Sequence, residues 1–402
     1  MLLRFLSLLL FTNVMIAQSD TSLMDNIFQV DSLGDEKFVG FIKEVSQDTQ
    51  FVFIGEQHGI KEVGIFTNVI FDLVHNDGFR TLCIETDALA ARKIQQMASS
   101  KEPLKLANAL YQKFPLAIPF YNNASDYDLF TNVVSKGGTI WGIDQTFMAQ
   151  FRLNLDHLSK NTTNPALKKM TDELKDKAKI AFKESFTSKS FGDMFMYSYT
   201  DALHESLLAT RPNPREAEIL YQLKKTREIY GHFASKRYYW NNEVRGQLMK
   251  SNFNTYYKEA LKTDPTPKVV LKLGATHATR GLSMTNIYDV SNYLSELAIF
   301  NNMRSLHFMV AGMNGTVLEG NPFVENPVRK FDNTEQLPKE LQELAVDFDK
   351  KFTVVHLEPL REKSYGSLFS ESLKTFIFNF DVLVLVNNAE ALEPFQKNSG
   401  TE

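Results

Sequence analysis

Two short segments of the chain place a histidine just after an apolar run that ends in glycine. In the first, the apolar run 51–54 leads into a glycine, and Glu56 and His58 follow. In the second, the run 269–273 leads into a glycine, and His277 comes three residues later. Each run predicts a buried strand, and open α/β sheets bind ligands at the carboxyl ends of their strands. Two such units in one chain predict that both imidazoles point into one cleft.

Two more carboxylates stand at the ends of predicted strands. Glu85 ends the strand expected at 80–85, and Asp144 ends the strand expected at 139–144. A histidine beside a carboxylate suits proton transfer near neutral pH, because the imidazole accepts the proton and the carboxylate fixes its tautomer. Two histidines with carboxylates also match the ligands that Zn²⁺, Mn²⁺ or Co²⁺ prefer. That metal set would be His58, His277, Glu56, Glu85 and Asp144.

Each of these residues also has a structural alternative. Glu56 would suit the N-terminus of the helix expected from residue 61, and His58 would suit a plain turn. Glu85 and Asp144 would equally pair with Arg or Lys at the sheet edge. His277 would also fit as a hydrogen-bonded histidine of the core.

Arg280 follows the second histidine unit, and it has two interpretations. It is either a surface residue or a guanidinium that faces the cleft and holds a substrate carboxylate or a developing oxyanion. Familiar catalytic signatures are absent from the sequence. It has no Gly-x-Ser-x-Gly, no phosphate-binding glycine-rich loop, no dinucleotide fingerprint after a strand and no His-Glu-x-x-His.

The elements that must position these residues alternate between strand and helix. This order predicts an α/β fold with a central, mostly parallel mixed sheet flanked by helices. Strands are expected at 51–55, 80–85, 139–144, 268–273, 305–310, 352–356 and 380–386. Helices are expected at 61–75, 88–99, 126–135 and 338–348, with a short helical lead-in within 18–50.

Residues 147–262 differ from the rest of the chain, because they show helical spacing and no convincing strand. They predict a large helical insertion that covers the carboxyl edge of the strands. Within it, the charged stretch 168–183 is typical of a helix with a solvated face. Before it, the segment 116–123 is expected as a loop over the cleft, where Phe120 and Tyr121 either pack or contact a substrate.

Composition limits the class of protein and its compartment. The chain has 402 residues, of which 43% are hydrophobic, so it can bury a sizeable core. Its net charge of −4 gives no support for nucleic acid or an anionic membrane as a partner. The partner expected instead is a small-molecule substrate. The only cysteine, Cys83, lies in an apolar run and predicts a buried thiol without a disulfide.

The N-terminus predicts export. Residues 1–17 read as a secretory signal peptide, with Arg4 before an apolar stretch, and an uncleaved anchor is the alternative. The mature chain, 18–402, is then expected to be one catalytic domain, secreted or periplasmic, without a membrane span.

Three segments resemble the erythromycin esterase-like family. They are Ile54-Gly-Glu-Gln-His-Gly59, Ile84-Glu-Thr-Asp87 and Asn242-Glu-Val-Arg-Gly-Gln-Leu-Met249, and the resemblance extends over about residues 50–390. It implies hydrolysis of an ester or lactone by a histidine-activated water. His58 would be the general base, and Glu56 and Glu85 its carboxylate neighbours. His277 would be the second cleft histidine, and Arg245 the arginine on a helix beside the site.

The sequence departs from that family at three points. Only Gln57 separates the glutamate from the histidine, Gly246 stands where an acidic residue follows the arginine, and His277 lies in Gly-Ala-Thr-His. The shorter Gly-Glu-x-His form is similar to the wider superfamily, which includes haem-binding lipoproteins and Tiki-type metalloproteases.

Three functional hypotheses follow. In the first, His58 takes a proton from water, Glu56 or Glu85 orients it, and His277 and Arg280 stabilise the oxyanion. In the second, a divalent metal lies between the two histidines and the carboxylates and activates the water. In the third, the protein is a non-catalytic haem binder with one cleft histidine as axial ligand.

Overall fold

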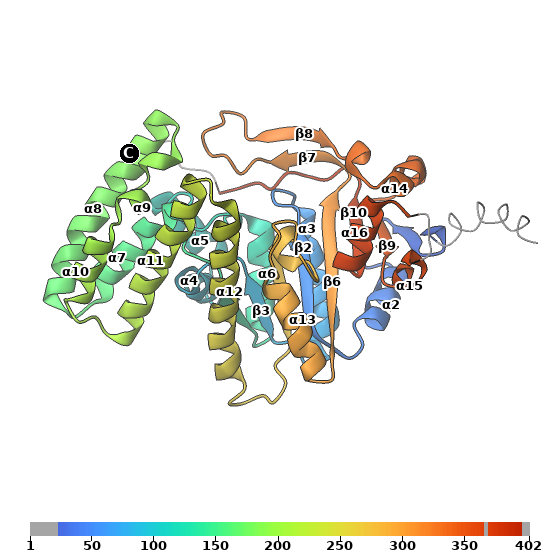
Figure 1. The fold of residues 1–402 in the computed structure, drawn as a ribbon, viewed down its shortest axis with the longest axis horizontal. Helices are drawn as coiled ribbons and strands as arrows, with labels where there is room; N and C mark the ends of the chain where they lie inside the picture. Colours follow the sequence, from blue (N-terminus) through green and yellow to red (C-terminus); the bar gives the residue numbers. More distant parts are fainter. Residues whose placement is uncertain (1–22, 366–368, 396–402) are drawn as a thin grey trace, which may run out of the picture.

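An eight-stranded sheet organises the fold (Figure 1). The computed structural model describes residues 23–365 and 369–395, so the predicted signal peptide at 1–17 lies outside the described residues. In order across the sheet, the strands are β1 (Ile27–Val30), β9 (Phe352–His356), β10 (Val382–Val386), β6 (Arg304–Gly312), β2 (Thr49–Glu56), β5 (Val269–Gly274), β3 (Thr81–Ile84) and β4 (Thr139–Gly142). A separate hairpin pairs β7 (Asn314–Leu318) with β8 (Val328–Asp332).

Strand directions confirm the predicted α/β class with a mostly parallel mixed sheet. Neighbouring strands from β10 through β4 are parallel, while β9 runs antiparallel to both β10 and β1. The helical lead-in expected within 18–50 was wrong in part, because Ile27–Val30 forms an edge strand. Its pairing partner on β9 is remote in the sequence, so no local pattern reveals it.

The helices cover both faces of the sheet and fill the segment between β4 and β5. The α-helices are α2 (Glu36–Val45), α3 (Glu62–His75), α4 (Ala88–Ala98), α5 (Pro103–Lys113), α6 (Ala124–Ser135), α7 (Phe151–Asn161), α8 (Pro165–Ser188), α9 (Phe195–Ser198), α10 (Asp201–Leu208), α11 (Pro214–Ala234), α12 (Tyr238–Ala260), α13 (Val290–Phe300), α14 (Lys339–Leu344), α15 (Leu360–Ser364) and α16 (Glu371–Asn379). The 3₁₀ turns are η1 (Met148–Gln150), η2 (Phe191–Asp193), η3 (Ala275–Ala278), η4 (Thr334–Gln336) and η5 (Ala345–Asp347).

The central strands are apolar on both sides because helices cover both faces. On β2, Val52 and Ile54 belong to a core shared with α3 and α6. Phe51 and Phe53, which alternate with them, belong to a second core shared with α12 and α13. Cys83 on β3 is buried in this second core with a free thiol, as predicted. Burial on both faces explains why the strands read as continuous apolar runs.

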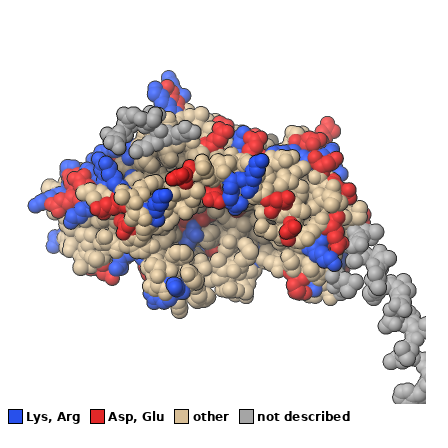
Figure 2. Space-filling view, turned by 90° about the horizontal axis from the view of Figure 1, so that it is seen from above, with Lys and Arg blue, Asp and Glu red and all other residues tan. Residues whose placement is uncertain are grey.

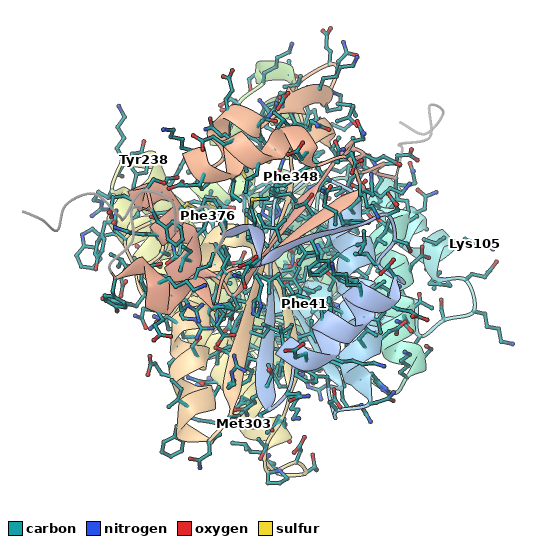
Figure 3. All side chains as sticks on the ribbon, turned by 90° about the vertical axis from the view of Figure 1, so that its right-hand side faces the viewer. Phe41, Lys105, Tyr238, Met303, Phe348 and Phe376 are labelled. Atoms are coloured by element: carbon teal, nitrogen blue, oxygen red, sulfur yellow. The ribbon has the colours of Figure 1, made fainter. Side chains whose placement is uncertain are left out.

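Figure 3 shows the same layers from the right-hand side of Figure 1. Phe41 of α2 packs edge-on against Phe28 of β1 and against the ring of His356 of β9. Lys105 at the start of α5 projects away from the protein. The edge strand β1 is therefore held by side-chain packing as well as by its hydrogen bonds to β9.

The segment between β4 and β5 is helical, as predicted for 147–262, and most of it lies to the left of the sheet in Figure 1. Helices α7 to α11 share a separate hydrophobic cluster, which includes Phe151, Leu174 and Leu220. The charged stretch predicted at 168–183 lies within α8, whose Lys and Glu side chains are mostly exposed. The last helix, α12, returns to the sheet and packs Phe253 against Phe51.

The hairpin β7–β8 was not predicted as such, and it lies above the sheet in Figure 1. Phe323, in the turn between its strands, packs against Phe186 at the end of α8 and Phe191 of η2, with ring centroids 5.2 and 4.6 Å apart. The helical insertion and the hairpin therefore meet over the carboxyl edge of the sheet.

Charges of both signs are interspersed over the face seen in Figure 2. Among the described residues, no helix combines the length and the apolar character that crossing a bilayer requires.

Candidate active site

The first group of the site joins the ends of β2 and β5. Glu56 is the last residue of β2, and its Oε1 lies 3.0 Å from Nδ1 of His58. Its other oxygen, Oε2, accepts a hydrogen bond of 2.6 Å from Nζ of Lys272 on β5. Lys272 also lies 3.4 Å from Oδ1 of Asp126. Because β2 and β5 are adjacent and parallel, with Ile54 opposite Lys272, the lysine reaches the carboxylate from the next strand.

Because these side chains are buried, the pKa of each one depends strongly on the charges of its neighbours. Burial alone would raise the pKa of Glu56, but Lys272 and His58 outweigh it and lower that pKa to about 2. Burial alone would lower the pKa of His58, but Glu56 and then Glu85 raise it above its usual value. The pKa of Lys272 is likewise raised, since Asp126 and Glu56 outweigh its burial. Glu56 is therefore a fixed anion that favours the protonated form of His58.

The second group is built around Arg245 of α12. Its Nε and Nη2 donate to the two oxygens of Asp144, over 2.9 and 2.6 Å, and Nη2 also donates to Oε1 of Glu85 over 2.6 Å. The other oxygen of Glu85 accepts the backbone N–H of Gly274 at 2.6 Å. The backbone N–H of Glu85 donates to the hydroxyl of Tyr121 at 3.0 Å. Arg245 of the helical insertion thus binds two carboxylates, which lie at the ends of β3 and β4.

His277 belongs to a third group, on the 3₁₀ turn after β5. Its Nδ1 lies 2.7 Å from Oδ2 of Asp289, and its Nε2 lies 3.8 Å from Oε1 of Glu85. Burial and Arg245 both lower the pKa of His277, but Asp289 and Glu85 raise it above its usual value. The pKa of Glu85 falls to about 2, because His277, Arg245 and His58 outweigh its burial. Glu85 is therefore an anion between the two histidines.

Two glycines make room for these contacts. A Cβ at Gly274 would lie 2.9 Å from Nε2 of His58 and 3.2 Å from Oε2 of Glu85. Both side chains therefore pack directly against the backbone of Gly274. A Cβ at Gly246 would lie 3.2 Å from Oδ1 of Asp289. The acidic group beside His277 therefore comes from Asp289, which uses the space that a side chain at 246 would need.

The structure brings most of the sequence-predicted residues together and leaves one out. The residues that meet at the carboxyl edge of the sheet are Glu56, His58, Glu85, Asp144, Arg245 and His277. Arg280 does not join them. Its Nη2 binds Asp381 at 2.7 Å and the carbonyl of Ser305 at 3.2 Å, where β10 and β6 begin. The expectation that Arg280 faces the cleft was therefore wrong, because the chain after His277 runs back along the sheet to its opposite edge.

Sequence reasoning missed two charged members of the site. The sequence does indicate a role for Lys272, because a lysine inside an apolar run of a buried strand needs a partner. It also indicates one for Asp289, because Asp289 immediately precedes the helix at Val290 and its Oδ1 accepts the N–H of that residue. Neither signal identifies its partner, since both partners come from distant parts of the sequence.

An apolar pocket of about 400 Å³ opens beside His58. The side chain of His58 is 33% exposed, and its ring stacks on Phe120 with centroids 4.0 Å apart. The pocket walls come from the loop 115–123, from the turn 318–327 of the hairpin and from Phe186 of α8. Phe120 is thus a wall of the pocket, whereas Tyr121 is buried against Glu85.

The possible metal ligands do not fit a divalent cation in this arrangement. Glu56 already pairs with Lys272, and Glu85 and Asp144 already pair with Arg245, so two fixed cations stand where a metal would bind. No group of three or more His, Cys, Asp or Glu in the described part of the chain has an arrangement that could hold a metal ion. The donor set therefore suits proton transfer better than coordination.

Comparison with known proteins identifies the fold. Neither a protein family nor a curated protein sequence matches this chain. A histidine-to-asparagine mutant of the erythromycin esterase EreC, in its open conformation, matches with a TM-score of 0.59 and 15% identity, over 90% of this chain and 96% of the other. A Bacillus cereus protein matches with a TM-score of 0.60 and 12% identity, over 94% and 98%. A succinoglycan biosynthesis protein matches with 0.59 and 13%, over 94% and 98%. The chain thus has the fold of these proteins.

Proposed function

We propose that this protein is a hydrolase that cleaves an ester or lactone of a small, mainly apolar molecule. The observation that carries the proposal is the pair formed by His58 and Glu56, 3.0 Å apart, where His58 lines an apolar pocket. The fold shared with the erythromycin esterase EreC supports it. We also propose export to the periplasm or medium, because residues 1–17 have the pattern of a signal peptide.

In the proposed mechanism, His58 is the general base. With Nδ1 lying 3.0 Å from the carboxylate of Glu56, Nε2 accepts a proton from the attacking water. Lys272 fixes the second oxygen of Glu56, so the imidazole has one orientation. His277, whose pKa is raised beside Asp289, donates toward the oxyanion when it is protonated. Arg245 adds a positive charge beside Glu85 and takes the role first expected of Arg280.

The proposal is tested with the mature chain and a panel of phenyl and alkyl esters and lactones, with initial rates followed in a pH-stat. Apolar acyl groups should give higher kcat/KM than charged ones, because the pocket walls carry prolines, leucines and phenylalanines. A protein that is folded but hydrolyses none of these compounds above the rate in buffer would argue against esterase activity.

Replacement of Glu56 by Gln should move the pH profile. A general base works when neutral, so kcat/KM of the wild type should rise with pH through a midpoint above 6.5, the usual pKa of histidine. Without the anion of Glu56, the pKa of His58 falls and the midpoint moves to lower pH. The plateau should drop at least about tenfold, because the imidazole loses its orienting partner.

Glu390→Gln is the matched control for this experiment, since it removes one carboxylate from an exposed pair with Lys61. Its profile should match that of the wild type. An unmoved midpoint in Glu56→Gln would show that His58 is not the group that titrates.

Replacement of Gly274 by Ala should lower kcat/KM by roughly 10²-fold, because its Cβ would displace the imidazole of His58 and the carboxylate of Glu85. The backbone at Gly274 has φ −52° and ψ 142°, angles that alanine also adopts, so the fold should persist. Gly40→Ala in α2 is the control, as nothing lies within 4 Å of its Cβ position. Unchanged kinetics in Gly274→Ala would contradict the placement of the site over β5.

A further inference from the structure

A buried arginine without a carboxylate partner lies outside the proposed active site. Arg152, in the first turn of α7, is 7% exposed. Its Nε donates to the carbonyl of Ala149 at 3.2 Å, and Nη2 donates to the carbonyl of Pro115. The centre of its guanidinium lies 3.3 Å from the ring centroid of Phe182. Among the described residues, no carboxylate forms an ion pair with Arg152.

A buried cation without a counter-ion is costly. Burial lowers the pKa of Arg152 to about 9, and no neighbouring anion offsets this effect. The two carbonyls and the aromatic ring stabilise the guanidinium only in part, since none of them carries a full negative charge. The part of the guanidinium that these groups leave uncovered is therefore suited to an anionic ligand.

The same arginine lines a cavity of about 690 Å³ whose other cations lie mainly on α8. Lys175, Lys179 and Lys183 are spaced four residues apart, so they project from one face of that helix. Lys175 pairs with Asp172, whereas Lys179 and Lys183 form no ion pair within the described part of the chain. These two ammonium groups are therefore available to a ligand in the cavity.

The carboxylates of this cavity do not balance its cations. Five cationic residues line it, against the two carboxylates of Asp156 and Asp176. Asp156 is already neutralised by Lys113 at 3.2 Å and Lys160 at 3.0 Å. Phe114, Phe182 and Phe186 form apolar parts of the wall. The cavity therefore combines a positive end with aromatic surface.

We propose that this cavity binds a phosphate group, with Arg152 as its buried anchor and Lys179 and Lys183 as its outer partners. Guanidinium groups suit phosphate because they donate two parallel hydrogen bonds. The cavity adjoins the pocket of His58, since Pro115 and Phe186 stand in the walls of both, yet the two share no charged side chain. Phosphate binding in this cavity requires no hydrolase activity at His58.

The experiment titrates inorganic phosphate into the mature chain by calorimetry at low ionic strength and measures the melting temperature with and without phosphate. Arg152→Met should weaken phosphate binding at least about tenfold, because it removes a charged hydrogen-bond donor at similar volume. Without phosphate, this variant should melt at or above the wild-type temperature, since it relieves an uncompensated buried charge. If Arg152 had a purely structural role, the Arg152→Met variant would instead melt at a lower temperature than the wild type.

The double variant Lys179→Ala/Lys183→Ala tests the same site through exposed residues that the fold does not need. It should also weaken phosphate binding, even if Arg152→Met fails to fold. The matched control is Lys169→Ala/Lys177→Ala, which removes the same charge from exposed positions of α8 outside the cavity. Equal binding by the test and control doubles, or no binding by the wild type at millimolar phosphate, would overturn the proposal.

A second titration with phenyl phosphate separates two sources of the phosphate group. Tighter binding than inorganic phosphate, lost in the same variants, identifies a phosphate ester whose apolar part contacts Phe182 and Phe186. Equal or weaker binding, lost in the same variants, identifies free phosphate as the ligand. Retention of phenyl phosphate by both variants would count against the site.

Discussion

Replacement of His58 by Asn is expected to lower kcat/KM for ester hydrolysis by about 10²–10⁴-fold, the usual contribution of one positioned general base. Asparagine keeps a polar side chain of similar reach beside Glu56 but cannot accept a proton from water. KM should change little, because most of the pocket wall comes from other residues. Steady-state kinetics on the best ester of the panel, at a pH well above the midpoint of the wild-type profile, measure the effect.

His75→Asn is the control for this variant, since His75 lies at the end of α3, away from the pocket that His58 lines. Both variants should melt within a few degrees of the wild type, so that a loss of rate reflects chemistry. If His58→Asn kept its rate within a factor of about ten, His58 would not be the general base.

The sequence carried enough information for the strands and for the histidines at their ends. Apart from Lys272, the runs before Glu56 and before Gly274 are apolar because both faces of the sheet are covered, and that pattern is local. Parallel strands bring their carboxyl ends to one edge, so the sequence pattern alone places Glu56, Glu85 and His277 together.

The partners of those residues could not be predicted, because they depend on strand register and on the path of loops. Lys272 reaches Glu56 only because β5 lies beside β2 in one register. Asp289 meets His277 because the segment before α13 folds back against Gly246. Arg280 shows that residues close in the sequence can also lie far apart in the fold. It is three residues from His277, yet it binds Asp381 at the opposite edge of the sheet.

Replacement of Lys272 by Met is expected to destabilise the protein by about 3–5 kcal/mol at pH 7, the range seen when one partner of a buried ion pair is removed. Its side chain is 3% exposed and lies 2.6 Å from Glu56 and 3.4 Å from Asp126, so two buried carboxyl groups lose their cation. Urea unfolding at constant pH measures the change in the free energy of unfolding.

The pH dependence of that loss identifies its cause. In the wild type, the pKa of Glu56 is about 2, below its ordinary 4.5, so its stabilising contribution is present above pH 4.5 and is lost as the pH falls toward 2. Without Lys272, Glu56 takes up a proton more readily, and the deficit of Lys272→Met should shrink between pH 7 and pH 4.5. Lys262→Met, which breaks an exposed pair with Glu259, should cost no more than about 1 kcal/mol. A deficit in Lys272→Met that stayed constant with pH would assign the loss to packing around Tyr121 and not to the buried charges.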